Sequence, residues 1–463
     1  RYGARLGGLA CGLVMWGAAA WGSAIDTDVV FGQIDARLRA LVAETEAASA
    51  VAGSLRYPES RPGDEATWRS RGAGRWTGGF LPGALWQMYG RSGDPSYRAW
   101  AERWTMGLVG KLPGEAVTAA ELAAFDFSPG DHDVGFVYNE SFGRGYALTG
   151  DATYRAVRDE AAARLDARFD AGYGAMRSWD WGTWNEVVII DHMMNLELLF
   201  DAAADGGPAG YVDRAVAHAL TTADYHVRSD GSTYHVVEFG FEQPEVGTWQ
   251  GLETESTWAR GQAWALHGYA NVARQATEAE VDPAMVGELL SVTTRVADYF
   301  VDNLPDDGVP YWDFELPEGE PALLARDTSA AAIAASGLID LAEQVADPEQ
   351  SERYFAAAEG LLVALLEPAY FAVDAPGETR ILLQGIGRHP AARGGSIAEA
   401  VPTSLIYADH YFIEALIRYE DAIFRDSRAA TAQVVLPEPG AVVLMMAMGL
   451  WAATWHRSSS PWA

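Results

Sequence analysis

The sequence predicts an all-α protein built from repeated helical hairpins, and two observations support that prediction. Apolar residues recur at three- and four-residue spacing over seven segments, as on the buried face of an amphipathic helix. A motif that joins one helix to the next also recurs. One alternating stretch, residues 232–239, predicts a short strand instead. The seven predicted helices are residues 25–51, 99–112, 154–169, 212–225, 286–304, 330–345 and 400–423.

The recurring motif is Tyr-Gly-Arg-Ser-Gly-Asp-Pro-Ser-Tyr at residues 89–97, which returns as Tyr-Ala-Leu-Thr-Gly-Asp-Ala-Thr-Tyr at residues 146–154. A looser copy covers residues 346–354. In each copy an aspartate stands where it would cap the next helix. A hairpin unit that repeats every ~50–60 residues cannot bury its apolar face alone. We therefore expect the hairpins to stack into a solenoid or to close into a ring.

Composition excludes several classes of partner. Hydrophobic residues make up 49% of the chain and charged residues 21%, so a well-buried core is expected. The net charge of −31 argues against nucleic acid or an anionic membrane as a partner, because either needs a basic face. The single cysteine, Cys11, cannot form an intrachain disulfide. The 17 tryptophans are dense for a protein whose aromatic residues serve packing alone.

Residues 1–24 have the pattern of a secretory signal peptide. Arg1 and Arg5 precede an apolar stretch that begins at Leu6, and the small residues 22–24 form a cleavage site. A buried first helix is the alternative, but the glycines and the lack of polar alternation count against it. We expect this segment to be removed on export.

Residues 429–463 contain a second candidate targeting signal. Pro437-Glu438-Pro439 precedes an apolar run over residues 440–455, and His456-Arg457 follow. The run falls slightly short of the ~17–25 residues that span a bilayer comfortably. This order resembles the PEP-CTERM sorting signal, which an exosortase recognises in certain Gram-negative bacteria. The resemblance implies export to the periplasm or cell surface, transient anchoring by the tail, and an exosortase-type enzyme as a partner.

Two aspartates are the candidate catalytic residues. Asp191 closes a run of four aliphatic residues and is expected to begin a helix at the edge of an apolar wall. Desolvation there raises the pKa of a carboxyl, which suits an acid that must hold a proton near neutrality. Asp133 stands between His132 and Gly135-Phe136, where a helix cap is an equally good interpretation. Trp179, Trp181 and Trp184 precede Asp191 closely, as expected beside a sugar-binding site.

Other candidates have weaker signals. His235 lies on the predicted strand, and a lone histidine is more often structural than catalytic. In Trp258-Ala259-Arg260, the arginine could bind the carboxylate of an acidic sugar, but a buried structural ion pair is about as good an account. Asn185 and Asn195 could bracket Asp191 with hydrogen bonds. No metal-ligand spacing stands out among the nine histidines, and no metal or other cofactor is expected.

Several motifs together, in this order, resemble the unsaturated glucuronyl hydrolases of glycoside hydrolase family 88. The match runs from about Trp76 to Arg418, and its most specific part is Trp-Ala-Arg-Gly-Gln-Ala-Trp at residues 258–264. The other motifs are His-Asp-Val-Gly-Phe (132–136), Ile-Asp-His-Met-Met-Asn (190–195), Asp-Gly-Ser-Thr (230–233), Val-Pro-Tyr-Trp-Asp-Phe (309–314) and the Asp-Thr-Ser block at 327–337.

The resemblance implies an (α/α)6 barrel over residues 25–428 that acts as one catalytic domain. The implied substrate is an oligosaccharide carrying the 4,5-unsaturated uronic acid that polysaccharide lyases leave at the non-reducing end. Asp191 would protonate the double bond and then activate water, while Asp133 would hold ring hydroxyls and tune the charge of its partner. The implied substrate-binding residues are His132, Trp179, His235, Gln250, Trp258, Arg260 and Gln262.

Three alternatives remain open. An unsaturated rhamnogalacturonyl hydrolase of the related family 105 would share the fold. A catalytically silent surface glycan-binding protein would account for the tryptophans and the sorting signal. An α/α-barrel lyase or epimerase would need a tyrosine or histidine base set, which the sequence does not identify. Family members often carry histidine where Gln384 stands, and residues 388–402 look longer than usual, so the preferred disaccharide is left open.

Overall fold

The description rests on a computed structural model, which describes residues 24–435 except 129, 317–324, 374 and 390–400; for 426–435 it describes the backbone alone. The predicted signal peptide and sorting motif therefore lie outside the described residues, as does most of the segment 388–402. Ala24–Tyr419 form one compact unit. The described part of a second unit is the helical stretch from Glu420 to Val435.

Helices make up most of the described chain, as the sequence predicts. The helices are α1 (Thr27–Ala52), α2 (Phe80–Ser92), α3 (Pro95–Leu108), α4 (Ala119–Ala124), α5 (Arg144–Thr149), α6 (Ala152–Asp166), α7 (Glu197–Ala204), α8 (Gly210–His226), α9 (Ala259–Glu278), α10 (Pro283–Asp302), α11 (Thr328–Ala342), α12 (Pro348–Leu365) and α13 (Ile406–Val435), with the short turns η1 (Trp76–Gly79), η2 (Gly135–Gly143) and η3 (Ile190–Leu196). Six of the seven predicted helices are confirmed within a few residues.

The seventh predicted helix, residues 400–423, is wrong at its start. The structure has a strand at Thr403–Leu405, and α13 begins at Ile406. Periodicity also missed α2, α4, α5, α7, α9 and α12. Helix α9 is buried on nearly every side, so its polar residues face the packed interior instead of solvent.

The recurring motif is a helix-joining cap, as predicted. Asp94 Oδ1 accepts a hydrogen bond from the Ser96 N–H at 2.8 Å, and Asp151 Oδ1 accepts one from Thr153 at 2.7 Å. Asp347 does the same for Glu349 at 3.0 Å. In the first two copies a glycine in the left-handed region, Gly93 or Gly150, ends the preceding helix.

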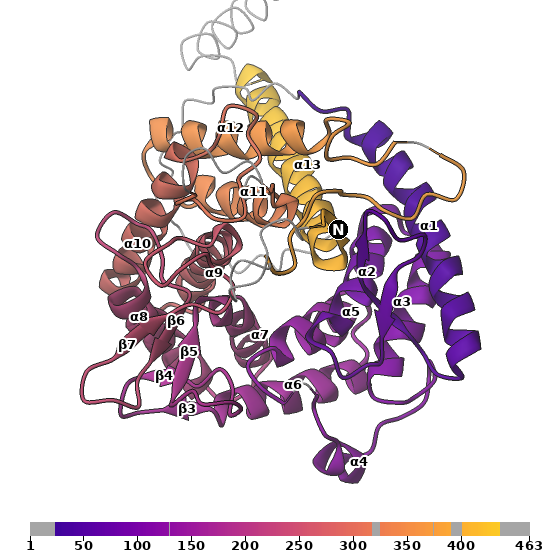
Figure 1. Ribbon diagram of the computed structural model, residues 1–463, viewed down its shortest axis with the longest axis horizontal. Coiled ribbons are helices and arrows are strands. Elements are labelled where there is room, and N and C mark those ends of the chain that lie inside the picture. The colour runs from indigo at the N-terminus through magenta and orange to yellow at the C-terminus, as the bar shows by residue number, and fades with distance from the viewer. Residues whose placement is uncertain (1–23, 129, 317–324, 374, 390–400, 436–463) are drawn as a thin grey trace, which may run out of the picture. The chain divides into compact units, whose positions relative to one another are not determined.

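Within Ala24–Tyr419 the helices are arranged around a common centre, so that the hairpins close into a ring rather than a solenoid (Figure 1). Successive helices pack as pairs, including α2 with α3, α9 with α10 and α11 with α12. Strand β1 (Tyr57–Pro62) pairs antiparallel with β8 (Thr403–Leu405), which joins the beginning of the unit to its end. The all-α fold with (α/α)6-barrel architecture is therefore the correct prediction.

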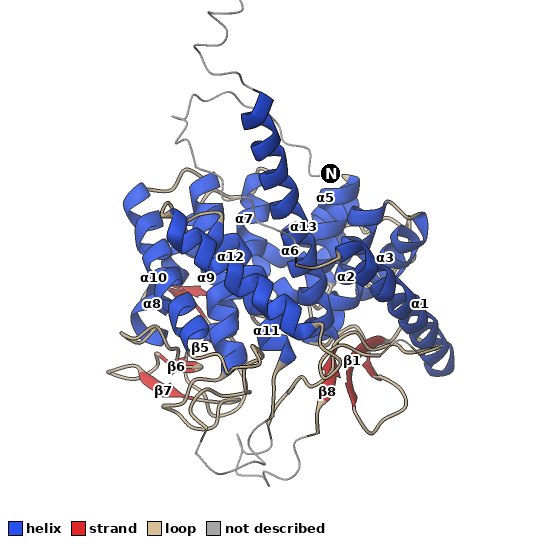
Figure 2. Cartoon of the chain, turned by 90° about the horizontal axis from the view of Figure 1, so that it is seen from above, coloured by secondary structure: helices blue, strands red, loops and turns tan. Residues whose placement is uncertain are grey.

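The strands lie at one end of the helices, together with most of the long connections (Figure 2). Besides β1 and β8 they are β2 (Arg69–Arg71), β3 (Phe169–Asp170), β4 (Ala175–Met176), β5 (Val187–Ile189), β6 (Val236–Glu238) and β7 (Glu245–Gly247). The order β5-β6-β7 forms a three-stranded antiparallel sheet. Strand β6 confirms the predicted strand at residues 232–239.

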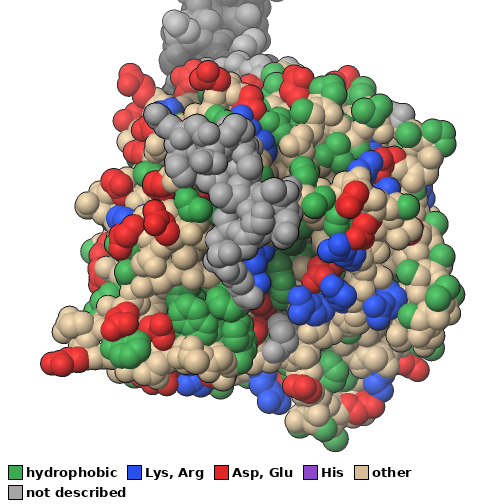
Figure 3. Space-filling model, viewed as in Figure 1, with side chains coloured by type: hydrophobic (Ala, Val, Ile, Leu, Met, Phe, Trp, Pro, Cys, Tyr) green, Lys and Arg blue, Asp and Glu red, His purple; other side chains and the backbone are tan. Residues whose placement is uncertain are grey.

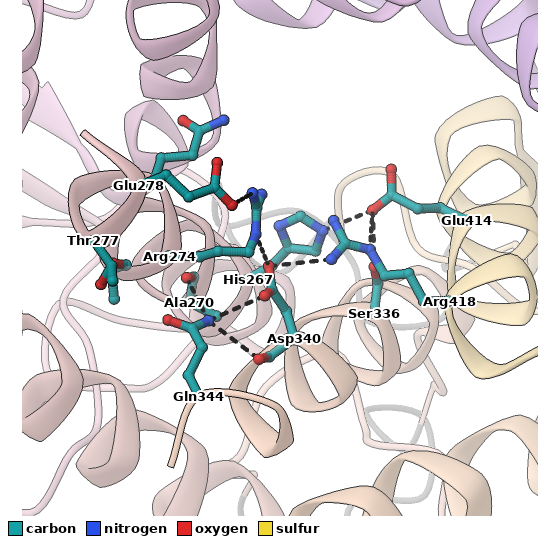
Figure 4. Close-up of polar contacts among 12 residues, drawn as sticks. His267, Ala270, Arg274, Thr277, Glu278, Ser336, Asp340, Gln344, Glu414 and Arg418 are labelled. Atoms are coloured by element: carbon teal, nitrogen blue, oxygen red, sulfur yellow. Dashed lines mark hydrogen bonds and ion pairs between the residues drawn. The ribbon is translucent and has the colours of Figure 1, made fainter. Parts of the chain in front are cut away.

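Buried charges cross-link the helices inside the ring (Figure 4). Asp340 of α11 is paired with Arg274 of α9 at 3.2 Å and with Arg418 of α13 at 3.1 Å. Glu414 accepts from His267 at 2.9 Å. Burial opposes ionisation of Asp340, yet Arg418 and Arg274 hold its pKa below the ordinary value. These pairs fix the relative positions of three helices, because removing one partner would leave a buried charge uncompensated.

Candidate active site

Asp133 lies two residues before the start of η2, which is a π-helical segment, a form that appears frequently at functional sites. The alternative in which Asp133 merely caps a helix is not what the structure shows. Val134 holds the N-cap position and makes no side-chain capping hydrogen bond. The carboxyl of Asp133 instead lies against His132, with Oδ1 at 3.2 Å from Nε2.

The contacts of His132 identify where the proton of this pair resides. Nδ1 lies 3.0 Å from the carbonyl oxygen of Ser178, which can only accept, so Nδ1 carries the hydrogen. Burial lowers the pKa of His132, so Nε2 of the neutral ring is a lone pair. The 3.2 Å contact is then a hydrogen bond only if Asp133 donates. Burial, with the charge of Asp191, raises the pKa of Asp133 to about 8, which agrees with a protonated carboxyl near neutrality.

Asp191 lies just beyond the buried strand β5, at the second position of η3, as expected from the aliphatic run. Its side chain is not a helix cap. Burial raises its pKa from 3.8 to about 7, although Arg260 and a backbone hydrogen bond work in the opposite direction. Asp191 is therefore a carboxyl that exchanges its proton near neutral pH, which is the property required of a general acid that must also act as a base.

His235 faces Asp191 because of the pairing of β5 with β6. The N–H of Ile190 donates to the carbonyl of His235 at 3.0 Å, which continues the ladder by one residue. Nδ1 of His235 accepts from the N–H groups of Trp249 and Gln250 at 3.0 and 3.2 Å. Nε2 must therefore carry the hydrogen of the neutral ring, and it lies 3.6 Å from Asp191 Oδ2.

These two facing atoms are both unsatisfied. Asp191 Oδ2 and His235 Nε2 are buried and have no hydrogen-bond partner among the described residues. Buried polar atoms normally find hydrogen-bond partners. We call these two unsatisfied atoms the open pair, and because one of them belongs to a carboxyl of raised pKa, the open pair indicates a place where a ligand binds. The arrangement presents a proton donor and a neutral N–H donor side by side.

Asn195 brings the two aspartate motifs together. Its Oδ1 accepts from the N–H of Phe136 at 2.8 Å, which fixes the start of η2 against η3. The approach requires glycine at position 135, because an added Cβ would lie 2.5 Å from Asn195 Oδ1 and 2.8 Å from its Cα. Asn195 also donates to Asp191 as expected, but to its backbone carbonyl at 3.5 Å and not to its carboxyl. Asn185 instead bonds the carbonyl of Gly240 at the sheet edge.

The guanidinium of Arg260 binds other groups of the protein. It forms a buried ion pair with Asp327 at 2.7 Å and donates to the carbonyls of Ile386 and Gly387, both at 2.6 Å. Trp258 is buried between this guanidinium, 4.6 Å from its ring, and the ring of His235 at 4.7 Å. Arg260 is therefore a partner in a structural ion pair, and its guanidinium is not free to bind the carboxylate of a sugar.

Gln250 and Gln262 have different positions. Gln250 is half-buried, and its Oε1 accepts from Arg260 at 3.2 Å, which leaves the amide N–H group as the side-chain donor beside His235. Gln262 is fully buried, and its amide bonds Thr233, Gly231 and Val296. The prediction that Gln262 binds substrate is wrong in this geometry, because α9 turns its side chain into the packed interior. It holds the Asp-Gly-Ser-Thr loop instead.

Trp179 is buried, with only 5% of its surface exposed. Trp181 covers one of its faces in a parallel stack, with ring centroids 4.8 Å apart. The predicted stacking role of Trp179 does not fit a ring whose face is already occupied. Its indole N–H, however, has no partner among the described residues.

Sequence reasoning missed three residues that support the site. Asp327 neutralises Arg260, Ser178 receives the hydrogen of His132, and Asp131 accepts from the backbone N–H of Asp133 at 3.0 Å. Burial raises the pKa of Asp131 to about 6. Asp327 and Ser178 come from segments distant in sequence. Asp131 stands next to His132 in the sequence, but nothing in the local pattern separated it from an ordinary loop residue.

The described part of the chain also contains two groups of possible metal-ligand atoms. Asp131, His132 and Asp133 bring theirs within 4.8 Å of one another, as do Glu140, His410 and Glu414. In the first group the proton shared by Asp133 and His132 lies where a cation would have to bind. In the second, Arg144 already pairs with both glutamates. Neither donor set therefore fits a resident metal ion.

A closed ring of helical hairpins, with a carboxyl that titrates near neutrality and tryptophans beside it, defines an acid–base enzyme of the glycoside hydrolase class. No family model matches the sequence. Individual relatives do. An unsaturated glucuronyl hydrolase of Formosa agariphila is 35% identical over 356 residues, which is 76% of this chain and 81% of the relative. One from Bacillus sp. strain GL1 is also 35% identical over 356 residues, 75% and 87% of the two chains.

Solved structures agree with these relatives. The crystal structure of an unsaturated glucuronyl hydrolase specific for heparin matches with a TM-score of 0.71 at 33% identity, covering 85% of this chain and 98% of the other. That of the Bacillus sp. GL1 enzyme matches with a TM-score of 0.70 at 30% identity, covering 85% and 97%. The chain belongs to the unsaturated glucuronyl hydrolase family, glycoside hydrolase family 88, and is a hydrolase of that type.

Proposed function

We propose that this hydrolase removes the 4,5-unsaturated uronic acid by hydrating its double bond, with Asp191 as acid and base, and that it does so outside the cytoplasm. The observation that supports the chemistry is the open pair formed by Asp191 Oδ2 and His235 Nε2, 3.6 Å apart and buried, on a carboxyl whose pKa is about 7.

In the first step the protonated carboxyl of Asp191 gives its hydrogen to C4 of the sugar. The π electrons of the C4–C5 bond form the new C–H bond, and the ring oxygen shares the positive charge left at C5. Asp191 is then an anion, and the N–H of His235 stabilises it by hydrogen bonding. The new charge also helps Asp133 to keep its proton, because Asp191 raises the pKa of Asp133.

In the second step a water oxygen bonds to C5 while its proton passes to the carboxylate of Asp191. The resulting hemiketal opens, C1 becomes a hemiacetal, and collapse of that hemiacetal releases the aglycone as an alcohol. Asp191 ends the cycle protonated. One carboxyl can serve both steps because its pKa lies near the operating pH.

A panel of lyase products tests this function. Oligosaccharides from chondroitin, hyaluronan, heparin, ulvan and gellan each carry a conjugated double bond whose ultraviolet absorbance disappears on hydration. We expect loss of absorbance with at least one of them, with an activity that falls as pH rises through about 7, since the acid must be protonated. The same assay with unsaturated pectin fragments distinguishes this activity from that of an unsaturated rhamnogalacturonyl hydrolase. Unchanged absorbance across the panel would overturn the proposal.

Export is supported by two sequence features, the signal-peptide pattern of residues 1–24 and the Pro437-Glu438-Pro439 motif with its apolar run and basic end. We propose a location in the periplasm or at the surface of a Gram-negative bacterium, with an exosortase-type enzyme as a partner. Among the described residues, no helix is both long and apolar enough to cross a membrane. Fractionation of expressing cells, with mass determination of the mature chain, tests this. Full-length protein confined to the cytoplasm would contradict it.

A further inference from the structure

Four tryptophans form a closed cluster beside the active site: Trp179, Trp181, Trp184 and Trp249. Trp179 and Trp181 are parallel, with planes 14° apart, while Trp184 stands edge-on to Trp179 at 6.0 Å. Trp249 is edge-on to both Trp181 and Trp184. Trp179, Trp184 and Trp249 pack against the apolar side chains of β5 and β6. The cluster is therefore held rigidly by the sheet that also positions His235.

Trp181 is the exposed member of this cluster. It leaves 48% of its surface accessible, whereas Trp179 leaves 5%. Figure 3 shows a hydrophobic patch on this face of the molecule, beside the strands β5 to β7. An exposed indole fixed by stacking on a second indole is a preformed platform, so a ligand that covers it does not have to order a mobile side chain first.

The cluster is continuous with the catalytic residues on both sides. The ring of Trp179 lies 6.0 Å from that of His132, whose Nε2 faces the protonated carboxyl of Asp133. The backbone N–H of Trp249 donates to His235, which faces Asp191. Trp181 lies one ring further from His132 than Trp179 does. A chain of sugars that leaves the active site along this wall would meet Trp179 first and Trp181 next.

The orphaned indole N–H of Trp179 points independently to a polar ligand. It is buried with no partner among the described residues, and a sugar hydroxyl is an acceptor that would satisfy it. Trp179 thus offers an edge with a donor, and Trp181 offers a flat face. Together they match a saccharide, which combines hydroxyl groups with an apolar C–H face. A purely apolar partner would leave the N–H of Trp179 unsatisfied.

We propose that Trp181 stacks on the second sugar of the aglycone, with Trp179 donating a hydrogen bond to the first. This inference rests on the proposed function and extends it. The protein would be adapted to unsaturated oligosaccharides of three or more sugars rather than to disaccharides alone. Substrates that fill the platform are bound more tightly, while the chemistry at Asp191 is unchanged.

The experiment compares the kinetics of Trp181→Ala on an unsaturated disaccharide and on the matching tetrasaccharide from the same lyase. We expect KM for the tetrasaccharide to rise about tenfold, since an aromatic contact contributes up to about 1.4 kcal/mol beyond its buried area. KM for the disaccharide and kcat for both substrates should stay unchanged. Trp181→Phe keeps a stacking face and should restore most of the tetrasaccharide affinity.

Phe241→Ala is the matched control, because Phe241 is equally exposed at 45% and lies between β6 and β7 without joining the cluster. It should change neither KM. Equal KM values for wild type and Trp181→Ala on the tetrasaccharide would overturn the inference. So would a change in oligomeric state on gel filtration without a change in KM, because the platform would then bind another copy of the chain. If the wild-type protein hydrates neither substrate, the proposed function itself fails.

Discussion

Replacing Asp191 by Asn separates its catalytic role from a structural one, because the two make opposite predictions for stability. The ordinary pKa of the side chain is 3.8, and burial raises it to about 7. The folded protein therefore binds more protons at this site than the unfolded chain does between these pH values. The contribution of Asp191 to the stability of the wild type must therefore fall as pH rises through that window.

The magnitude follows from the shift. At about 1.4 kcal/mol per pKa unit, ionising Asp191 in the folded state costs about 4 kcal/mol above pH 8, and about 0.5 kcal/mol at pH 4. Asn has the same shape and no charge to desolvate. Water and the neighbouring carboxyl relax around the charge, so we expect about 1–2 kcal/mol of the full value to appear as a gain in stability for Asp191→Asn at pH 8.

The assay is thermal unfolding of both proteins at pH 5 and pH 8, together with turnover. Asp191→Asn should melt a few degrees higher than wild type at pH 8, and the difference should shrink to less than half of that at pH 5, where the unfolded chain is ionised but the folded carboxyl is not. Its turnover should fall by about 10³-fold or more, since both proton transfers are lost. A variant that is less stable than wild type at pH 8 would show that the carboxylate of Asp191 holds the fold together, and would refute the reasoning.

Asp409→Asn provides the control. Asp409 is fully buried, burial raises its pKa to about 8, and its Oδ1 accepts from the N–H of Leu382, which an Asn oxygen can also do. It contributes nothing to the open pair at Asp191. This variant should gain stability at alkaline pH in the same way and keep full activity.

Three further predictions concern the neighbours. His132→Phe removes the acceptor for the proton of Asp133, so the pKa of Asp133 should fall by about one unit in a carboxyl titration followed by NMR; an unchanged pKa would contradict the proton placement. Arg260→Met should lose about 3–5 kcal/mol of stability by leaving Asp327 buried and unpaired, and adding Asp327→Leu should recover stability without activity; recovery of both would make Arg260 dispensable for the site. Dialysis against EDTA should leave turnover unchanged, because His132 and Asp133 share a proton where a cation would bind; activity restored only by an added metal would refute this.

The sequence was informative where local chemistry decides the outcome. Asp94 and Asp151 cap helices because a short acceptor before a helical segment bonds the first free N–H groups. Asp191 was recognised because four aliphatic neighbours imply burial, and burial raises the pKa of a carboxyl. His235 next to Asp191 follows from strand pairing, which a short β pattern only suggests.

The sequence was uninformative where distant segments decide it. Arg260 is a structural cation because Asp327 and two carbonyls of the 384–387 loop reach it, and nothing at positions 258–262 encodes that encounter. Gln262 points away from the site because α9 is buried on all sides, so helical position alone could not tell inward from outward. Trp179 and Trp181 differ in exposure although they are two residues apart, because only the first packs on β5.

Burial acts on the histidines of this site in the opposite sense to the carboxyls, and the two effects together set the pH range of the enzyme. Burial lowers the pKa of His218 to about 3 and that of His226 to about 4, and it lowers those of His132, His192 and His235 as well. The unfolded chain therefore binds more protons than the folded one below pH 6.5, and each such histidine removes up to about 2 kcal/mol of stability at pH 5. Asp191 and Asp133 act in the other direction, because the stability that each contributes falls from pH 3.8 up to about 7 and about 8, and Asp191 loses its catalytic proton at the upper end of its range. Burial thus keeps a proton on Asp191 and keeps protons off the neighbouring histidines. Near pH 6.5 these histidines no longer lower the stability and Asp191 is still mostly protonated, so that is where we expect the protein to be most stable and still active.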